Sequence, residues 1–314
     1  MMLKQVIDLY ELLDSASVSG ADVKQHLFQL GANPDHIEVK PLQSEKGAAD
    51  FIKIRIEGKH GKSVGGDAPT LGIIGRLGGI GARPAITGFV SDGDGALAAL
   101  AAAAKLITMQ QRGDQLGGDV IVTTFICPNA PTREHKPVPF MDSPISMEDT
   151  WAHEVDNAMD AIVSIDTTKG NRIMNYRGIA ISPTVCQGYI LRVSETVLDI
   201  VERVTGEKAH VFALSQQDIT PYGNTLYHLN SILQPSVATR SPVIGIALST
   251  ATAVAGCATG ASHEVDVEQA ARLAIEIGKD LGTGLCQFID HDEFAEIQKR
   301  YGSMTHFQQP GAKS

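Results

Sequence analysis

Residues 70–75 read TLGIIG, residues 95–110 read GALAALAAAAKLITMQ, and residues 120–127 read VIVTTFIC. The first and third segments are short and almost wholly apolar, which is typical of central strands covered on both faces. The alanine-rich segment between them has the length and pattern of a helix. Strands that alternate with helices build a mainly parallel sheet. This stretch therefore predicts an α/β fold.

The alternation continues on both sides of this stretch. Residues 51–56 (FIKIRI) alternate like a half-buried strand, and apolar runs at 161–165 and 243–248 predict further central strands. We expect a three-layer α/β/α sandwich with a mainly parallel mixed sheet, one domain over residues 1–305 and a flexible tail over residues 306–314. Further helices are expected at residues 2–13, 21–30, 146–159, 195–204 and 264–281.

Composition narrows the classes of function. The 314 residues carry a formal net charge of −10, with a pI near 5.4, which argues against nucleic acid or an anionic membrane as a partner. The sequence shows no signal-peptide pattern and no apolar segment typical of a bilayer span. Its four cysteines are scattered without the spacing of a disulfide framework or a zinc site. We therefore expect a cytoplasmic protein.

Polar residues follow the predicted strands, at the edge of a parallel sheet where ligands bind. Carboxylates and imidazoles together form the donor set that a hard or borderline metal ion needs. The candidates at this edge are Arg76, Asp92, Asp94, Asn129, Glu134, His135, Asp166 and His263.

Each candidate also has a purely structural explanation. Asp92 or Asp94 is suited to cap the following helix, and Asp166 to cap a turn. Glu134 lies among prolines, where solvated surface is expected, and Cys127 at a strand end is typical of a small buried apolar residue. Only the order and spacing of the candidates, taken together, favour a functional site.

That order resembles the metal-dependent aminopeptidases of the glutamyl, deblocking and tetrahedral type, within the zinc-exopeptidase superfamily. The resemblance implies a zinc-exopeptidase-like (phosphorylase/hydrolase-like) fold, and the sequence also resembles a family of unknown function. The segments that carry the resemblance to the aminopeptidases are LYELLDSASVSG (9–20), LGIIGRLGGIG (71–81), GFVSDGDGALAAL (88–100), VIVTTFICPNAP (120–131), AIVSIDTT (161–168), QQDITPYGNT (216–225) and GASHEVD (260–266).

The resemblance implies metal ligands at Asp92, Asp166 and His263. The family's first histidine ligand falls on Arg76, and its glutamate pair falls on residues 128–129, which are Pro and Asn. An arginine stays charged at neutral pH and cannot ligate a cation, so we expect it to neutralise the nearby aspartates. The sequence therefore predicts at most one divalent metal ion, zinc or similar, per chain.

The first candidate function is a metal-dependent hydrolase of a small peptide or amide. A metal would lower the pKa of bound water and polarise the substrate carbonyl. Arg76, Asn129 and Asp218 would bind the substrate, Arg76 through a carboxylate, and Glu134 or His135 would supply the base.

Two alternatives stay open. One is a metal-free, non-catalytic small-molecule-binding or regulatory protein on a peptidase scaffold. The other is a non-hydrolytic enzyme that uses Cys127 and His135 in proton transfer. The expected partner is a small molecule or a short peptide. Because the segment between Gly75 and Asp92 is too short for a lid domain, the cleft rim is expected to be covered by a second subunit in a homo-oligomer.

Overall fold

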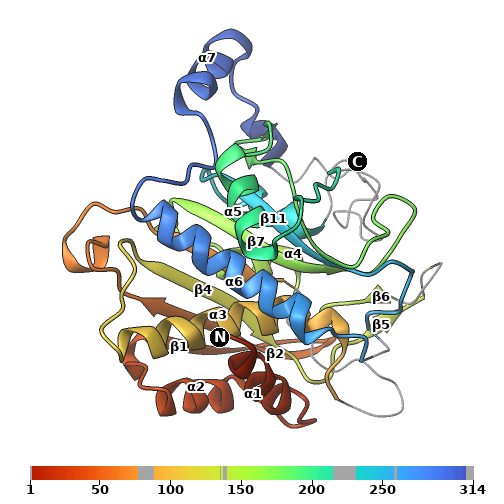
Figure 1. Ribbon diagram of the computed structural model, residues 1–314. Helices are drawn as coiled ribbons and strands as arrows, with labels where there is room; N and C mark the ends of the chain where they lie inside the picture. The colour runs from red at the N-terminus through yellow and green to blue at the C-terminus, as the bar shows by residue number, and fades with distance from the viewer. Residues whose placement is uncertain are drawn as a thin grey trace.

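The computed structural model describes residues 2–76, 88–134, 136, 140–214, 231–257 and 260–308. A mixed sheet runs through the middle of the molecule, with strand order β1-β2-β4-β3-β7-β11-β9-β10 and with β8 paired to β11 (Figure 1). Its strands are β1 (Ile37–Ser44), β2 (Gly47–Ile56), β3 (Leu71–Gly75), β4 (Val120–Ile126), β7 (Ala161–Thr168), β8 (Gly178–Ile181), β9 (Val185–Cys186), β10 (Tyr189–Ile190) and β11 (Val243–Ser249). A separate ribbon pairs β5 (Thr132–Arg133) with β6 (Phe140–Met141).

The centre of the sheet is parallel. Strand β3 pairs in parallel with β4 and β7, and β7 pairs in parallel with β11. The outer strands β2, β8 and β9 join this centre in antiparallel fashion. The expected α/β class is confirmed, and the apolar runs predicted as central strands form β3, β4, β7 and β11.

Helices cover both faces of the sheet, but unequally (Figure 1). One face carries a layer in which α3 packs on α1 and α6, and α6 packs on α5; the opposite face carries α4 and the 3-10 helix η4. Helix α7 projects from the body. The bounds are α1 (Leu3–Leu13), α2 (Gly20–Gln29), α3 (Asp94–Gln110), α4 (Met147–Glu154), α5 (Glu195–Thr205), α6 (Glu264–Leu281), α7 (His291–Tyr301) and η4 (Ser231–Val237).

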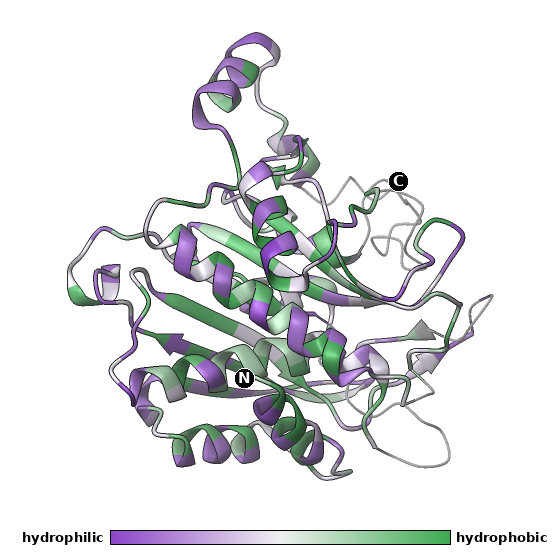
Figure 2. Ribbon diagram, in the orientation of Figure 1, coloured by the Kyte–Doolittle hydropathy of each residue, from purple (hydrophilic) through white to green (hydrophobic). Residues whose placement is uncertain are grey.

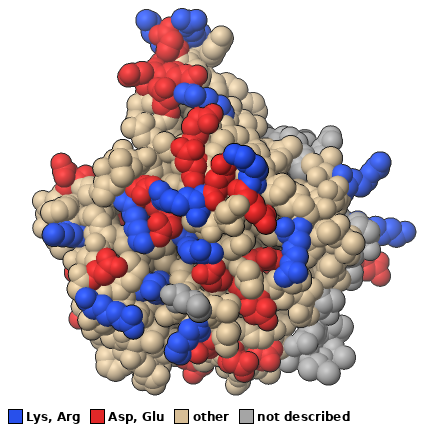
Figure 3. Space-filling view, in the orientation of Figure 1, with Lys and Arg blue, Asp and Glu red and all other residues tan. Residues whose placement is uncertain are grey.

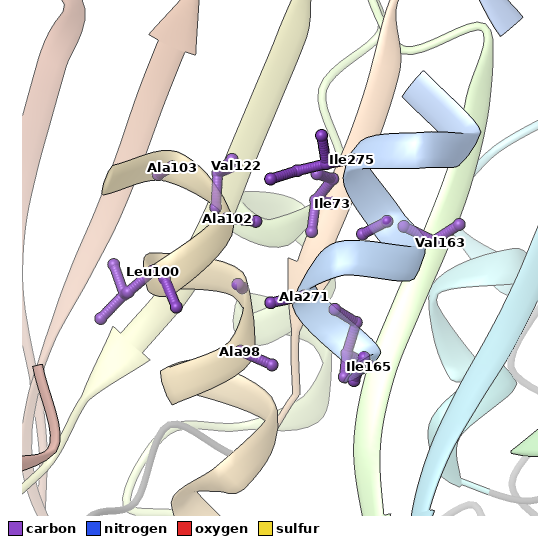
Figure 4. Packing of buried hydrophobic residues seen from close by; sticks show 14 of the residues in the cluster. Ile73, Ala98, Leu100, Ala102, Ala103, Val122, Val163, Ile165, Ala271 and Ile275 are labelled. Carbon is purple, nitrogen blue, oxygen red and sulfur yellow. The ribbon is translucent and has the colours of Figure 1, made fainter. Parts of the chain in front are cut away.

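Alanines let α3 lie close to the sheet. Figure 4 shows Ala98 and Ala102 of α3 and Ala271 of α6 packed over apolar side chains of the central strands. The start of α3 is pressed against the strand ends, since a Cβ on Gly95 would lie 2.5 Å from the carbonyl oxygen of Ile165. The sequence GDG at the helix start therefore places Asp94 at the carboxyl edge of the sheet.

Alternate residues of the central strands point to opposite faces. Ile73 and Val163 lie in the core under α3 and α6, whereas Ile74 and Ile162 lie in a second apolar cluster under η4. Figure 2 shows the central strands and α3 as largely hydrophobic, while α5 and α6 present hydrophilic residues outward. This alternation decides the face to which each residue beyond the strand ends points.

Some boundaries differ from those expected. Helix α4 ends at Glu154 rather than near residue 159, because Val155 is extended and the Asp156 carboxylate accepts the Ala158 backbone N–H at 3.0 Å. Strand β7 continues through Asp166, and residues 305–308 form a short 3-10 helix, η5.

On the face shown in Figure 3, acidic and basic side chains are interspersed, without one large field of a single sign. Within the described part of the chain, no helix has both the length and the apolar character that crossing a membrane requires.

Candidate functional site

Arg76 and Asp166 lie side by side at the carboxyl edge of the parallel strands. The register pairs Gly75 of β3 with Ile165 of β7, and the Arg76 backbone N–H donates to the Ile165 carbonyl at 2.8 Å. Both side chains therefore follow the alternation toward the face covered by α4 and η4.

The Arg76 guanidinium is buried in an ion pair that was not anticipated. Its Nη1 donates to Glu154 Oε2 at 2.5 Å, and its Nη2 donates to Gln234 Oε1 at 3.1 Å. The side chains of Arg76 and Glu154 are 1% and 0% exposed, and Gln234 is also fully buried. The expectation that Arg76 neutralises Asp92 and Asp166 is therefore wrong: the carboxylate that balances its charge comes from the end of α4, which packs over β4.

Three buried polar atoms of this cluster lack a hydrogen-bond partner among the described residues: Arg76 Nε, Glu154 Oε1 and Gln234 Nε2. Buried polar atoms are normally satisfied, and leaving one unpaired costs about 1–3 kcal/mol. Burial raises the pKa of Glu154, and the adjacent Arg76 opposes that rise. The cluster is electrically neutral, yet it still presents two donors and one acceptor.

Arg76 and Glu154 line a small cavity of about 40 Å³. Its walls are mainly apolar and come from the end of β4, from β6 and from the segment leading into α4; they include Phe125, Cys127, Met141 and Ile145. About 10–15 Å³ of space open to the centre of a water molecule is enough to hold one water, so a cavity of this size has room for a small polar group. Mainly apolar walls with a few polar side chains are typical of a binding pocket for a small ligand.

Asp166 lies on the same face as this cluster. Its Oδ1 accepts the Thr167 backbone N–H at 2.7 Å, and its Oδ2 accepts the Ser231 hydroxyl of η4 at 3.3 Å. The side chain, expected after the strand, belongs to β7 itself and is buried.

A second buried ion pair lies beside the start of α3. Lys169 Nζ donates to Asp94 Oδ2 at 2.9 Å, and the Ser262 hydroxyl donates to Asp94 Oδ1. The side chains of Lys169 and Asp94 are 5% and 1% exposed. Burial raises the pKa of Asp94, and Lys169 and then Ser262 oppose that rise. This group joins the loop after β7 to the beginnings of α3 and α6.

Asp92 and His263 lie at the same edge. The Asp92 backbone N–H donates to the Gly256 carbonyl at 3.1 Å, and a Cβ on Gly256 would lie 2.0 Å from Asp92 Oδ1. His263 precedes α6 directly after Ser262, with its Nδ1 4.0 Å from Asp266 Oδ2. The N-cap of α3 is Gly93, without a side-chain capping bond, so neither Asp92 nor Asp94 is the N-cap residue that the capping explanation requires.

The remaining sequence candidates fall into two groups. Asn129 and Glu134 are exposed, Glu134 directly after β5. His135 and Asp218 lie outside the described residues. Cys127 is buried, as its structural explanation predicted, and burial raises the pKa of its thiol to about 11.

The described side chains do not fit the metal site that the resemblance implies. Within the ranges that the structure describes, no three His, Cys, Asp or Glu side chains are placed to hold one ion. Asp166 points toward η4, whereas Asp94 lies at the start of α3 with Lys169 as its cation.

Sequence reasoning missed Glu154, Gln234 and Lys169. Glu154 and Gln234 are 78 and 158 residues from Arg76, and nothing in their local sequence indicates the contact. The sequence does indicate a role for Lys169, because this residue stands three positions after Asp166, at the end of an apolar strand, and so at the same edge of the sheet.

Comparison with known protein families defines the family of the chain. Residues 40–311 match the family described as "Protein of unknown function (DUF1177)", so the chain belongs to this family. The resemblance to a family of unknown function is thus confirmed. No curated protein matches the chain significantly.

Three solved structures are similar to the chain at low identity. The bottromycin maturation enzyme BotP is 13% identical with a TM-score of 0.48, over 87% of this chain and 69% of BotP. The cytosol aminopeptidase from Coxiella burnetii is 14% identical with a TM-score of 0.49, over 86% and 67% of the two chains. The leucine aminopeptidase from Caenorhabditis elegans is 12% identical with a TM-score of 0.49, over 91% and 66%.

Proposed function

We propose that the protein is a non-catalytic small-molecule-binding or regulatory protein that holds its ligand at the carboxyl edge of the sheet. The observation that carries this proposal is the buried pair of Arg76 and Glu154, which borders a cavity with mainly apolar walls. Each of the two residues has one polar atom without a hydrogen-bond partner among the described residues. A pocket of this kind selects ligands by a few placed polar groups.

The electrostatics support binding rather than hydrolysis at this cluster. Both buried cations at the edge, Arg76 and Lys169, already have a carboxylate partner. Glu154, held against an arginine and with its pKa raised by burial, is suited to accept a hydrogen bond from a ligand. Glu134, the expected base, is exposed on the surface beside β5.

A thermal-shift screen of small polar molecules tests the proposal. A ligand should raise the melting temperature of the wild type and leave that of the double variant Arg76→Met/Glu154→Met unchanged, because the variant removes the polar end of the cavity. Equal shifts in both proteins, or none in a broad screen, would contradict it.

A metal-dependent hydrolase of a small peptide or amide is the second candidate, with at most one divalent ion per chain. One observation favours it: Asp92 and His263, the ligands that the resemblance implies, both lie at the carboxyl edge. Elemental analysis of the purified protein distinguishes the two functions. Arg76→His should raise the metal content under the hydrolase proposal and leave it unchanged under the binding proposal.

We also propose that the protein is a cytoplasmic homo-oligomer, as the sequence led us to expect. Sedimentation at micromolar concentration tests the assembly, and a monomer there would contradict it.

A further inference from the structure

Two of the residues that line this cavity each carry a polar atom that lacks a hydrogen-bond partner among the described residues. Arg76 Nε is a donor, and Glu154 Oε1 is an acceptor. A group that satisfies both must carry an acceptor oxygen and an N–H or O–H donor close together. A carboxamide carries both, since its carbonyl oxygen has two lone pairs and its nitrogen has two hydrogens.

The charges of the site argue against a ligand carboxylate or ammonium group. Arg76 and Glu154 cancel each other, and both side chains are buried. A ligand carboxylate would place a second negative charge beside Glu154, and a ligand ammonium would place a second positive charge beside Arg76. Either would add an unpaired charge in a site with little solvent to screen it. A neutral group adds hydrogen bonds without adding charge.

The size and the walls of the cavity fit the same class. A cavity of about 40 Å³ has room for a small polar head group. Phe125, Met141 and Ile145 offer apolar contacts to the carbon chain that bears the head group.

We infer that this cavity binds the neutral carboxamide group of a small molecule, with the carbonyl oxygen on Arg76 and the amide nitrogen on Glu154. The inference rests on the proposed function and specifies its ligand class. Gln234 acts as a positioning residue for Arg76, because its Oε1 accepts from Arg76 Nη2.

Three nearly isosteric probes test the inference: propionamide, propionate and 2-butanone. Propionamide supplies a donor and an acceptor, propionate supplies two acceptors and a charge, and 2-butanone supplies an acceptor alone. In NMR titrations of the whole protein, propionamide should bind at least about ten-fold more tightly than either analogue, because each analogue leaves the Glu154 oxygen unpaired.

Two thiols report where the probe binds. Burial raises the pKa of both Cys127 and Cys186 to about 11, so the two thiols are matched in acidity, but Cys127 lines the cavity and Cys186 belongs to β9. Saturating propionamide should slow the reaction of Cys127 with N-ethylmaleimide, followed by peptide mass spectrometry, and leave that of Cys186 unchanged.

Variants complete the test. Ala130→Leu fills the cavity from a buried lining position and should weaken propionamide binding at least ten-fold, whereas Ala295→Leu on the exposed side of α7 should not. If Ala130→Leu does not fold, Arg76→Met/Glu154→Met takes its place.

The outcomes separate the two proposals. Tighter binding of propionate or 2-butanone, with protection of Cys127, would overturn the carboxamide and leave a binding site in place. If none of the probes and no molecule of a wider polar set protects Cys127, the cavity holds water alone and the proposed function fails as well.

Discussion

Replacing one partner of the Arg76–Glu154 pair should lower the free energy of unfolding far more than replacing both partners. Arg76→Met leaves Glu154 as an uncompensated buried carboxylate, since both side chains are excluded from solvent and lie 2.5 Å apart. Breaking a buried pair in this way costs about 3–5 kcal/mol. The entropy of unfolding scales with chain length, so for 314 residues this loss corresponds to a melting temperature about 5–8 °C lower.

The double variant Arg76→Met/Glu154→Met should recover most of that loss. Replacing a buried ion pair by apolar side chains of similar volume is neutral or stabilises by about 1–4 kcal/mol. Against this gain, Gln234 Oε1 loses its donor, which costs about 1–3 kcal/mol. We therefore expect the double variant to lie within about 3 kcal/mol of the wild type.

Urea unfolding of the wild type, both single variants and the double variant closes a double-mutant cycle. The surface pair Lys4–Asp8, in which Lys4 is 76% exposed, provides the control: Lys4→Met should cost less than about 1 kcal/mol. The reasoning is refuted if Arg76→Met costs no more than this control, or if the double variant is as unstable as the single one.

Three further results are expected. Burial raises the pKa of the Glu154 carboxyl above its ordinary 4.5, so the folded state binds the carboxyl proton more tightly than the unfolded state does. The free energy of unfolding of the wild type, relative to that of the double variant, should therefore decrease as the pH rises from about 4.5 through the folded pKa. Urea titrations at several pH values measure this difference, and an increase with pH would contradict the burial argument. Lys169→Met should lower the free energy of unfolding by about 3–5 kcal/mol, because Asp94 loses its buried cation. Substituting the half-exposed Lys62 by Met should lower it by less than about 1 kcal/mol, and equal losses in chemical denaturation would exclude a buried Lys169–Asp94 pair. Gly206→Ala should lower the free energy of unfolding by about 1 kcal/mol, because a φ of 74° is unfavourable for alanine and no atom lies within 4 Å of the added Cβ. An unchanged melting temperature would rule out the left-handed backbone conformation at residue 206.

The central strands could be predicted because burial on both faces leaves a plain signal. Val120–Ile126 and Val243–Ser249 are apolar throughout, and each lies inside the sheet. Strand β1 lacks such a signal: it is an edge strand, half-exposed, and interrupted by Lys40 and Pro41, residues that discourage pairing with another chain. Helix α7 is not among the predicted helices, although Phe294, Ile297 and Tyr301 recur at helical spacing. These few apolar residues stand among charged ones, and only Phe294 is buried.

The position of the site could be predicted more readily than the contacts between its residues. Parallel topology brings Arg76 and Asp166 to one edge whatever the other residues are, so position alone identified them. The partner of Arg76 depends on where α4 ends and on which turn of η4 faces β3, and both follow from packing rather than from local sequence. A one-turn shift of α4 would move Glu154 by about 5 Å and leave the guanidinium unpaired.

Two neutral ion pairs at one edge have a consequence for the kind of ligand that the protein selects. The chain carries a net charge of −10, which disfavours the approach of anions, yet Arg76 and Lys169 are both already matched by buried carboxylates. An anion therefore gains no free cation from this pair. Of the two carboxylates that line the Arg76 cavity, Glu154 is paired with Arg76, and Asp142 lies 3.4 Å from Lys46 Nζ. The remaining polar atoms of Arg76 and Glu154 are suited to a hydrogen-bonding group without net charge. Selection by neutral hydrogen bonds in a small, buried space can be strong, since an analogue that lacks one donor leaves a buried acceptor unpaired.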